Sequence, residues 1–287
     1  MLARIVEQDG IQFEVFGLRQ RVRHVISNPI KNWILPAQWL RRLMVWGGSP
    51  LVQESLRRPG GWKAMEIIYK NAPPIGFLDA ISVRDACFPM GIRNRKKLVT
   101  KIIADLVKGY AQAGCVVIVG VGAGPGTNIQ EGILASGVDR SKVAVYLIDM
   151  DSDAFEYGKE AAKQRGLSEV VHYIQGDARE IKKHVPNISP HIVKMIGILE
   201  YLNDDQVLEL FQAMHAAMAP GGSVITHSLV DAHNTRAFLE RALNWHIYTR
   251  TPEHATQLLE RAGFKDTTGK REPMGIYTVL VAKKARA

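Results

Sequence analysis

The stretch VVIVGVGAGPGTN, residues 116–128, decides the fold of this chain. It begins as an apolar run typical of a buried strand and passes directly into Gly122, Gly124 and Gly126, after which a helix is expected. Glycines at such a turn allow positive φ angles, let a ligand approach the main chain and leave amide groups to bind it. By themselves the glycines also fit a tight strand–helix turn that binds nothing.

Further short apolar runs follow this stretch toward the end of the chain. They lie at residues 143–148, 170–174, 191–199, 223–229 and 277–282. The segments between them favour helices at residues 127–136, 152–165, 178–184 and 204–218. Short apolar strands that alternate with helices predict a parallel sheet covered on both faces. The sequence therefore predicts an α/β class with a doubly wound, mostly parallel sheet.

Two acidic residues follow consecutive predicted strands. Asp149 lies 23 residues beyond Gly126, and Asp177 lies 28 residues beyond Asp149. The carboxyl ends of parallel strands share one edge of a sheet, where a carboxylate can accept the hydroxyls of a ribose. We expect Asp149 in that role and Asp177 as acceptor for the amine of an adenine. Alternatively, both residues are helix N-caps.

Six segments in this order resemble the class I S-adenosylmethionine-dependent methyltransferases. They are GVGAGPGT (120–127), LID (147–149), GDA (176–178), IGILEYLNDD (196–205), MAPGGSVI (218–225) and the ending ERAGFKDTTG…IYTVLVAKK (260–284). The resemblance covers about residues 95–287. It implies a Rossmann-like, doubly wound, seven-stranded sheet with an antiparallel C-terminal strand, and S-adenosyl-L-methionine as cofactor. Two positions depart from the family pattern, because Gly120 replaces a usual acid and His191 a usual Asp.

The resemblance also implies a set of cofactor-binding residues. They are Gly122, Gly124, Gly126, Asp149, Met150, Asp177, Ala178, Gly197, Ile198 and Arg95. Arg95 belongs to a basic run, residues 93–97, that we expect just before the first helix of the sheet domain. The run is either a solvated face or a clamp in which Arg93 or Arg95 grips a carboxylate with two hydrogen bonds.

Methyl transfer from a sulfonium proceeds by in-line displacement, which holding the reactants in place accelerates. A general base is needed only when the acceptor must lose a proton early. His227 at the end of a strand is the candidate base, and Glu200 and Tyr201 are candidates for contact with substrate or cofactor. For each of the three a structural role is the alternative, and we predict no metal site.

Other nucleotide chemistries fit less well. The glycine spacing gives neither a dinucleotide fingerprint nor a P-loop. The Asn/Asp-Pro-Pro-aromatic turn of many base methyltransferases is absent after the fourth strand, where the chain reads GILEY, and no cysteine is placed as a nucleophile. We therefore expect a small-molecule or lipid-like acceptor rather than nucleic acid. An inactive protein of this fold that docks a partner, and an aminopropyl transferase, remain alternatives.

The N-terminal part differs from the rest in charge and in tryptophan content. Residues 1–114 hold 18 Lys+Arg and 8 Asp+Glu, whereas residues 115–287 hold 19 and 20. Four of the five tryptophans, Trp33, Trp39, Trp46 and Trp62, lie within residues 28–62. We predict a mainly helical cap or extension at 1–94 and a cofactor-binding domain at 95–287. The tryptophans would form a small core in a lid, touch anionic lipid or stack on nucleic acid.

Composition limits the remaining possibilities. Only Cys87 and Cys115 are present, without a CxxC pair, and no apolar run reaches the roughly 18 residues of a membrane span. We expect a soluble, cytoplasmic protein without a transmembrane segment, for which peripheral membrane contact stays open. The sequence does not predict an oligomeric state.

Overall fold

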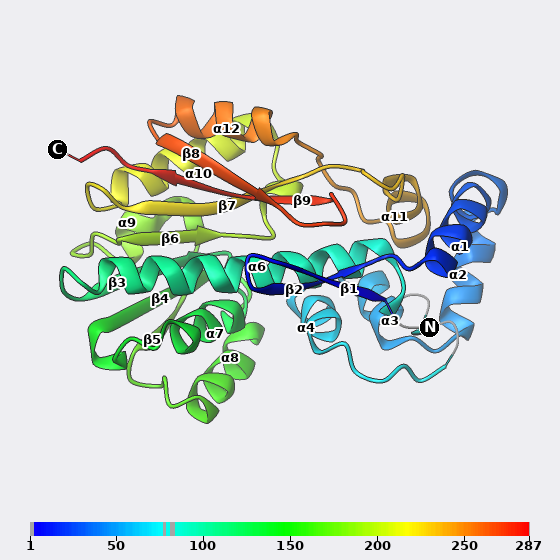
Figure 1. Ribbon diagram of the computed structural model, residues 1–287, viewed down its shortest axis with the longest axis horizontal. Helices are drawn as coiled ribbons and strands as arrows, with labels where there is room; N and C mark the ends of the chain where they lie inside the picture. Colours follow the sequence, from blue (N-terminus) through cyan, green and yellow to red (C-terminus); the bar gives the residue numbers. More distant parts are fainter. Residues whose placement is uncertain (1–2, 77–78, 81–83, 287) are drawn as a thin grey trace. The chain divides into compact units, whose positions relative to one another are not determined.

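The computed structural model describes residues 3–76, 79–80 and 84–286 (Figure 1). The chain forms two compact units. The first contains residues 1–97, 229–249 and 271–277, and the second contains residues 98–228, 250–270 and 278–287. The predicted domains, 1–94 and 95–287, place 229–249 and 271–277 with the sheet, whereas the structure groups both segments with the N-terminal part. Sequence patterns miss this grouping because it depends on contacts between residues about 200 positions apart.

The second unit is built on a seven-stranded sheet with the order β5-β4-β3-β6-β7-β9-β8. The strands are β3 (Val116–Val121), β4 (Val143–Asp149), β5 (Val171–Gln175), β6 (Ile192–Met195), β7 (Ser223–Leu229), β8 (Lys265–Arg271) and β9 (Tyr277–Lys283). Strands β5, β4, β3, β6 and β7 pair in parallel, and the sheet has one antiparallel strand. The predicted fold class is confirmed.

Helices cover both faces of this sheet (Figure 1). They are α6 (Cys87–Tyr110), α7 (Thr127–Ser136), α8 (Asp153–Gln164), α9 (Ile181–His184), α10 (Asp204–Ala217) and α12 (Pro252–Arg261), with short 3-10 turns at η3 (Arg140–Lys142), η4 (Ala178–Glu180) and η5 (Leu199–Tyr201). On one face, α9, α10 and α12 pack their apolar side chains on β3, β6 and β7. The apolar runs of the sequence are continuous because these strands are buried on both faces.

The first unit is mainly helical, as predicted. It contains the hairpin of β1 (Arg4–Gln8) and β2 (Ile11–Val15), followed by α1 (Leu18–Pro29), the π-helical turn η1 (Ile30–Ile34), α2 (Ala37–Trp46), α3 (Pro50–Arg57), α4 (Trp62–Lys70) and α11 (Arg236–Leu243). Its core joins Phe16, Ile68 and Phe88 to Trp245 and Tyr277 from the distant segments. Trp245 and Phe88 meet edge to face, with ring centroids 5.5 Å apart.

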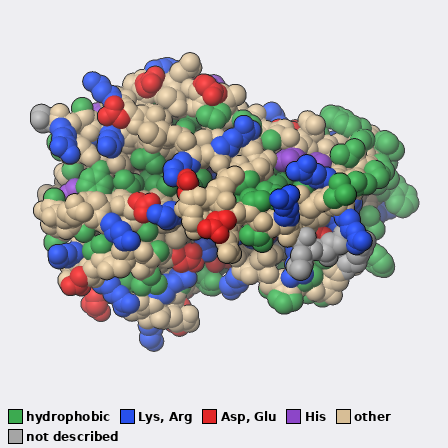
Figure 2. All heavy atoms as spheres, viewed as in Figure 1, with side chains coloured by type: hydrophobic (Ala, Val, Ile, Leu, Met, Phe, Trp, Pro, Cys, Tyr) green, Lys and Arg blue, Asp and Glu red, His purple; other side chains and the backbone are tan. Residues whose placement is uncertain are grey.

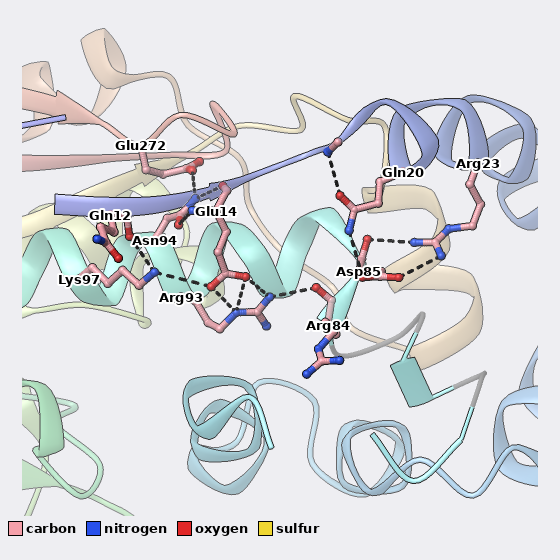
Figure 3. A network of polar contacts seen from close by, with 11 residues as sticks. Gln12, Glu14, Gln20, Arg23, Arg84, Asp85, Arg93, Asn94, Lys97 and Glu272 are labelled. Carbon is pink, nitrogen blue, oxygen red and sulfur yellow. Dashed lines mark hydrogen bonds and ion pairs between the residues drawn. The ribbon is translucent and has the colours of Figure 1, made fainter. Parts of the chain in front are cut away.

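A buried polar network holds the hairpin of the first unit to α6 (Figure 3). The Arg93 guanidinium donates to both carboxylate oxygens of Glu14, at 2.9 and 2.6 Å. The neighbouring Asn94 donates to the Glu14 carbonyl and to Glu272, and it accepts the Glu14 amide. Every strong hydrogen-bonding group of this cluster therefore has a partner, as burial requires.

The same network corrects two expectations about the basic run at residues 93–97. The run lies inside α6, which begins at Cys87, and not before it. Arg93 and Arg95 are also buried, so neither belongs to a solvated face. Both cationic side chains have partners: Arg93 pairs with Glu14, and the Arg95 guanidinium lies 4.4 Å from the centroid of the Tyr277 ring.

The two thiols differ in environment. Cys87 is buried, and burial raises the pKa of its thiol to about 11. Cys115 is exposed directly before β3, at the opposite end of that strand from the glycine turn. In the part of the chain that the structure describes, no helix combines the length and the apolar composition needed to cross a membrane.

Candidate active site

The turn after β3 has the backbone that the glycines predict. Gly122, Gly124 and Gly126 have φ angles of 52°, 53° and 70°, in the left-handed region that favours glycine. A Cβ on Gly122 would lie 1.8 Å from Cδ1 of Ile198, which follows β6. The turn and the segment after β6 are thus in contact, and only glycine fits at position 122.

Asp149 at the end of β4 is hydrogen-bonded to this turn. Its Oδ2 accepts the Gly124 amide at 2.7 Å, and its Oδ1 accepts the Asp151 amide at 2.9 Å. A carboxylate has about four acceptor positions, so each oxygen retains capacity for a further donor. Asp149 can therefore bind two ribose hydroxyls while it fixes the glycine turn.

Asp177 follows β5 and is brought beside Asp149 through the main chain, because the Gly176 amide donates to the Asp149 carbonyl at 3.0 Å. Its carboxylate caps η4 and accepts the Arg179 amide and guanidinium. These hydrogen bonds lower the pKa of Asp177. An adenine amine at this position would share the carboxylate with Arg179, so the predicted N-cap role and the predicted binding role coincide in one residue.

The other predicted cofactor residues lie in the connections that follow the strands. Met150 is exposed after β4, and Ala178 begins η4. Gly197 has a φ of 88° between β6 and η5, and Ile198 beside it packs on the sheet core. The ends of β3, β4, β5 and β6 are therefore adjacent, as the resemblance implies, and a glycine turn with two acceptor carboxylates suits the hydroxyls and the amine of an adenosine.

Three side chains that the sequence analysis missed, Tyr173, Gln130 and Arg165, support the glycine turn through hydrogen bonds. The Tyr173 hydroxyl donates to the Pro125 carbonyl at 3.2 Å and accepts the Gln130 amide at 3.0 Å. Arg165 in turn donates to Gln130 at 2.7 Å. Burial raises the pKa of Tyr173 to about 12, so the hydroxyl keeps its proton and stays a donor. No local motif marks these residues, because they come from three separate elements.

His227 and Glu200 form a buried pair. His227 lies in β7 and is fully buried, Glu200 lies in η5, and Nε2 of His227 is 3.2 Å from Oε2 of Glu200. The two side chains are within ion-pair distance, and the contact by itself does not assign the proton to either ring nitrogen. The pair thus places a buried imidazole beside a carboxylate, a combination that general-base catalysis can use. Tyr201, the third predicted catalytic residue, is next in η5 and partly exposed.

Arg250 holds the segment that carries Glu200. Arg250 is buried, although its side chain is charged. Its guanidinium donates to the carbonyls of Leu199 and Leu202 and, at 2.8 Å, to the carboxylate of Asp204. Partial burial works to raise the pKa of Asp204, but the hydrogen bonds and charges of Arg250 and His254 outweigh it and lower the pKa.

We expect Arg250→Ala to lower the free energy of unfolding of the second unit by roughly 3 kcal/mol, because it leaves two buried carbonyls without a donor. Since the pKa of Asp204 is lowered in the folded protein, the Arg250–Asp204 contribution is present above the unfolded pKa of about 4 and is lost as the pH falls below it. Urea unfolding at neutral and acidic pH measures both effects. His254→Ala removes an exposed partner of the Asp204 carboxylate and should lower the free energy of unfolding by less than about 1 kcal/mol. Equal losses in the two variants would contradict the role of Arg250 as the main support of this segment.

Arg95 and Gly120, which the sequence analysis singled out, lie in surroundings that the family pattern does not imply. Arg95 belongs to the first unit, where it stacks on Tyr277, and its role toward the cofactor stays a prediction. Gly120, which replaces the usual acid, faces α7 so closely that a Cβ would lie 2.8 Å from Leu147 and 2.9 Å from Ile129. The packing of β3 on α7 leaves no room for a carboxylate at this position.

Comparisons with known proteins agree with this geometry. A family model described as "Putative methyltransferase" matches residues 63–284, which is 222 of the 287 residues. No curated protein matches the chain at a significant level.

Several solved structures share the fold at low sequence identity. A protein of Bordetella parapertussis described as a "possible exported protein" has a TM-score of 0.64 at 15% identity, over 94% of this chain and 100% of that one. An O-methyltransferase family protein of Burkholderia thailandensis has a TM-score of 0.56 at 11% identity, over 99% and 80%. Magnesium protoporphyrin IX methyltransferase of Synechocystis, solved with S-adenosylhomocysteine bound, has a TM-score of 0.56 at 12% identity, over 77% and 93%.

Proposed function

Because the chain belongs to this methyltransferase family, we propose that it transfers a methyl group from S-adenosyl-L-methionine to a small organic or lipid-like acceptor. The observation that carries the proposal is the hydrogen bond from the Gly124 amide to Asp149, which joins the glycine turn to the ribose acceptor at one edge of the sheet. When bound, the cofactor supplies an electrophilic methyl group on a positively charged sulfur. The protein must then orient the acceptor and manage its proton.

The residues divide this work between them. Asp149 would bind the ribose, and the side-chain-free glycine turn, whose Gly124 and Gly126 amides donate to Asp149 and to the Ala123 carbonyl, would leave room for the cofactor. His227, beside the Glu200 carboxylate, takes the proton of a hydroxyl or amine acceptor. The burial of this pair supports an acceptor that is enclosed when bound, since the pair is shielded from water.

We also propose that the acceptor is a small molecule and that the protein acts in the cytoplasm. The segment GILEY after β6 forms a 3-10 turn and lacks the proline-containing motif of many base methyltransferases. Both cysteines are free thiols, which suits a reducing compartment. Screening candidate hydroxy and amino compounds for methyl uptake from labelled cofactor identifies the acceptor.

Calorimetry with S-adenosylhomocysteine tests the cofactor assignment. Asp149→Ala should weaken binding by about 10–100-fold, because hydrogen bonds to a charged acceptor are lost. Asp153→Ala, in the first turn of α8 near the same loop, is the matched control and should bind as the unchanged protein does. Failure of the unchanged protein to bind at millimolar ligand would overturn the proposal.

A further inference from the structure

Helix α1 of the first unit is turned with its apolar side outward. Leu18, Val22, Val25 and Ile26 recur at helical spacing and are all exposed, whereas the buried residues of the helix are Gln20 and Asn28. A helix that packs on its own protein normally buries the apolar stripe and exposes the polar one. The reversed arrangement indicates that the apolar stripe faces a different environment.

Hydrogen bonds to the polar side fix this orientation. The Gln20 amide donates to Asp85 at 3.0 Å, and Arg23 forms an ion pair with the same carboxylate (Figure 3). The Asn28 amide donates to the carbonyl of His233 at 2.9 Å. Rotating the helix to bury its apolar stripe would break these bonds, so the exposure is built into the unit.

The exposed apolar surface continues over η1 and α2. Trp33, Trp39 and Trp46 are 72%, 59% and 81% exposed, so the prediction that they form a small core is wrong for these three. Only Leu40 of α2 is buried, and Arg41 anchors the helix through the carbonyls of Arg241 and Ala242. We call this surface the tryptophan face; it comprises Leu18, Val22, Val25, Ile26, Trp33, Ile34, Trp39, Leu43 and Trp46.

Figure 2 shows hydrophobic side chains gathered over α1 and α2, with basic side chains beside them. Residues 15–53 contain six Lys and Arg and no Asp or Glu. Arg19, Arg21 and Arg42 are exposed, and the Arg42 guanidinium lies 5.9 Å from the Trp39 ring centroid. The surface is therefore apolar, aromatic and cationic at once. All of it precedes residue 63, where the family match begins.

We propose that the tryptophan face docks the protein on an anionic lipid bilayer. Interfacial helices combine a large apolar face with flanking Lys and Arg, and tryptophan favours the boundary between headgroups and acyl chains. Anionic lipid complements the positive charge of this segment. The inference concerns the first unit and does not depend on methyl transfer.

Charge and side-chain type favour lipid over other occupants. A second copy of the chain would bring two cationic segments together without an acidic residue between them. Nucleic acid would stack on the tryptophans, but it would leave the aliphatic side chains Val22, Val25 and Ile26 in water.

The test measures binding to vesicles of phosphatidylcholine with and without phosphatidylglycerol, by flotation and by tryptophan emission. The unchanged protein should float with the anionic vesicles, and its emission should shift to the blue as the three exposed indoles leave water. High salt should weaken binding, because it screens the attraction.

Two sets of substitutions separate the electrostatic and the apolar contributions to vesicle binding. Arg19→Glu/Arg21→Glu/Arg42→Glu should weaken partitioning by about 100-fold or more. Lys108→Glu/Lys163→Glu/Lys265→Glu changes the net charge equally at exposed positions of the second unit and should leave binding nearly unchanged. Trp33→Ala/Trp39→Ala/Trp46→Ala should abolish the blue shift and weaken binding at least about 10-fold, and the corresponding Phe variant should restore most of it.

Three results would overturn the proposal. The first is no preference of the unchanged protein for anionic vesicles at low salt. The second is a stable dimer in sedimentation that the Trp→Ala variant converts to monomer, which would make the face an interface between copies. The third is binding to single-stranded RNA or DNA that the tryptophan substitutions abolish while vesicle binding is unaffected.

Discussion

His227→Gln is expected to lower kcat by about 10²–10⁴-fold, the range that general-base catalysis supplies. Binding of S-adenosylhomocysteine should stay unchanged, because His227 lies on β7 and the proposed cofactor contacts on the sheet follow β3, β4, β5 and β6. Glutamine keeps a polar side chain beside Glu200, while the basic ring nitrogen is lost.

Two further variants make this result interpretable. Glu200→Gln keeps the shape of the side chain beside Nε2 and removes its charge, so its effect on kcat should be smaller than that of His227→Gln. His172→Gln, an exposed histidine in β5, is the matched control and should leave kcat unchanged. Turnover should be measured with the acceptor found by the screen. Unaltered kcat in His227→Gln, with a loss of stability, would assign the buried pair a purely structural role.

The largest expected effect on stability is at the pair of Glu14 and Arg93. Arg93→Met removes the cation and leaves the Glu14 carboxylate buried, with Lys97 at 3.7 Å as its nearest remaining cation. Breaking a buried ion pair from one side costs about 3–5 kcal/mol, because the remaining charge is no longer compensated. We therefore expect a loss of that size in the free energy of unfolding of the first unit, measured by urea unfolding.

Replacing both Glu14 and Arg93 should lower the free energy of unfolding less than replacing Arg93 alone. Glu14→Leu/Arg93→Met puts apolar side chains in place of both charges, so no buried charge is left without compensation. Asp105→Asn breaks the exposed pair with Lys101 within α6 and serves as the control, with an expected cost of at most about 0.5 kcal/mol. Similar losses in the free energy of unfolding for Arg93→Met and Asp105→Asn would show that burial does not determine how much each ion pair contributes to stability.

The sheet could be predicted from the sequence because its information is local. Strands buried on both faces give continuous apolar runs, and the glycine turn and Asp149 follow their strands directly in the chain. The start of α6 was missed because Pro89 and Gly91 lie in its first turns and disfavour a helix by local preference. Packing in the first unit overrides that preference, since Phe88, Met90 and Ile92 are buried there.

The parts of the site that escaped prediction depend on contacts between distant segments. His227 and Glu200 were each candidates, but nothing in the sequence showed that β7 and η5 would pair them. Arg250 reaches back to residues 199–204 from the start of α12, and no motif marks such an interaction. In α1 the outward direction of the apolar side follows only from the hydrogen bonds that Gln20 and Asn28 make with Asp85 and His233.

The contrast between the two thiols makes the chain ready for spectroscopic labelling without mutagenesis. A maleimide reacts with an exposed thiolate, so near neutral pH it should attach a fluorophore at Cys115 and spare Cys87, whose raised pKa and burial keep it protonated and shielded. The dye would lie before β3, away from the glycine turn. Energy transfer from the tryptophans to this dye would then report cofactor and vesicle binding in an otherwise unmodified protein.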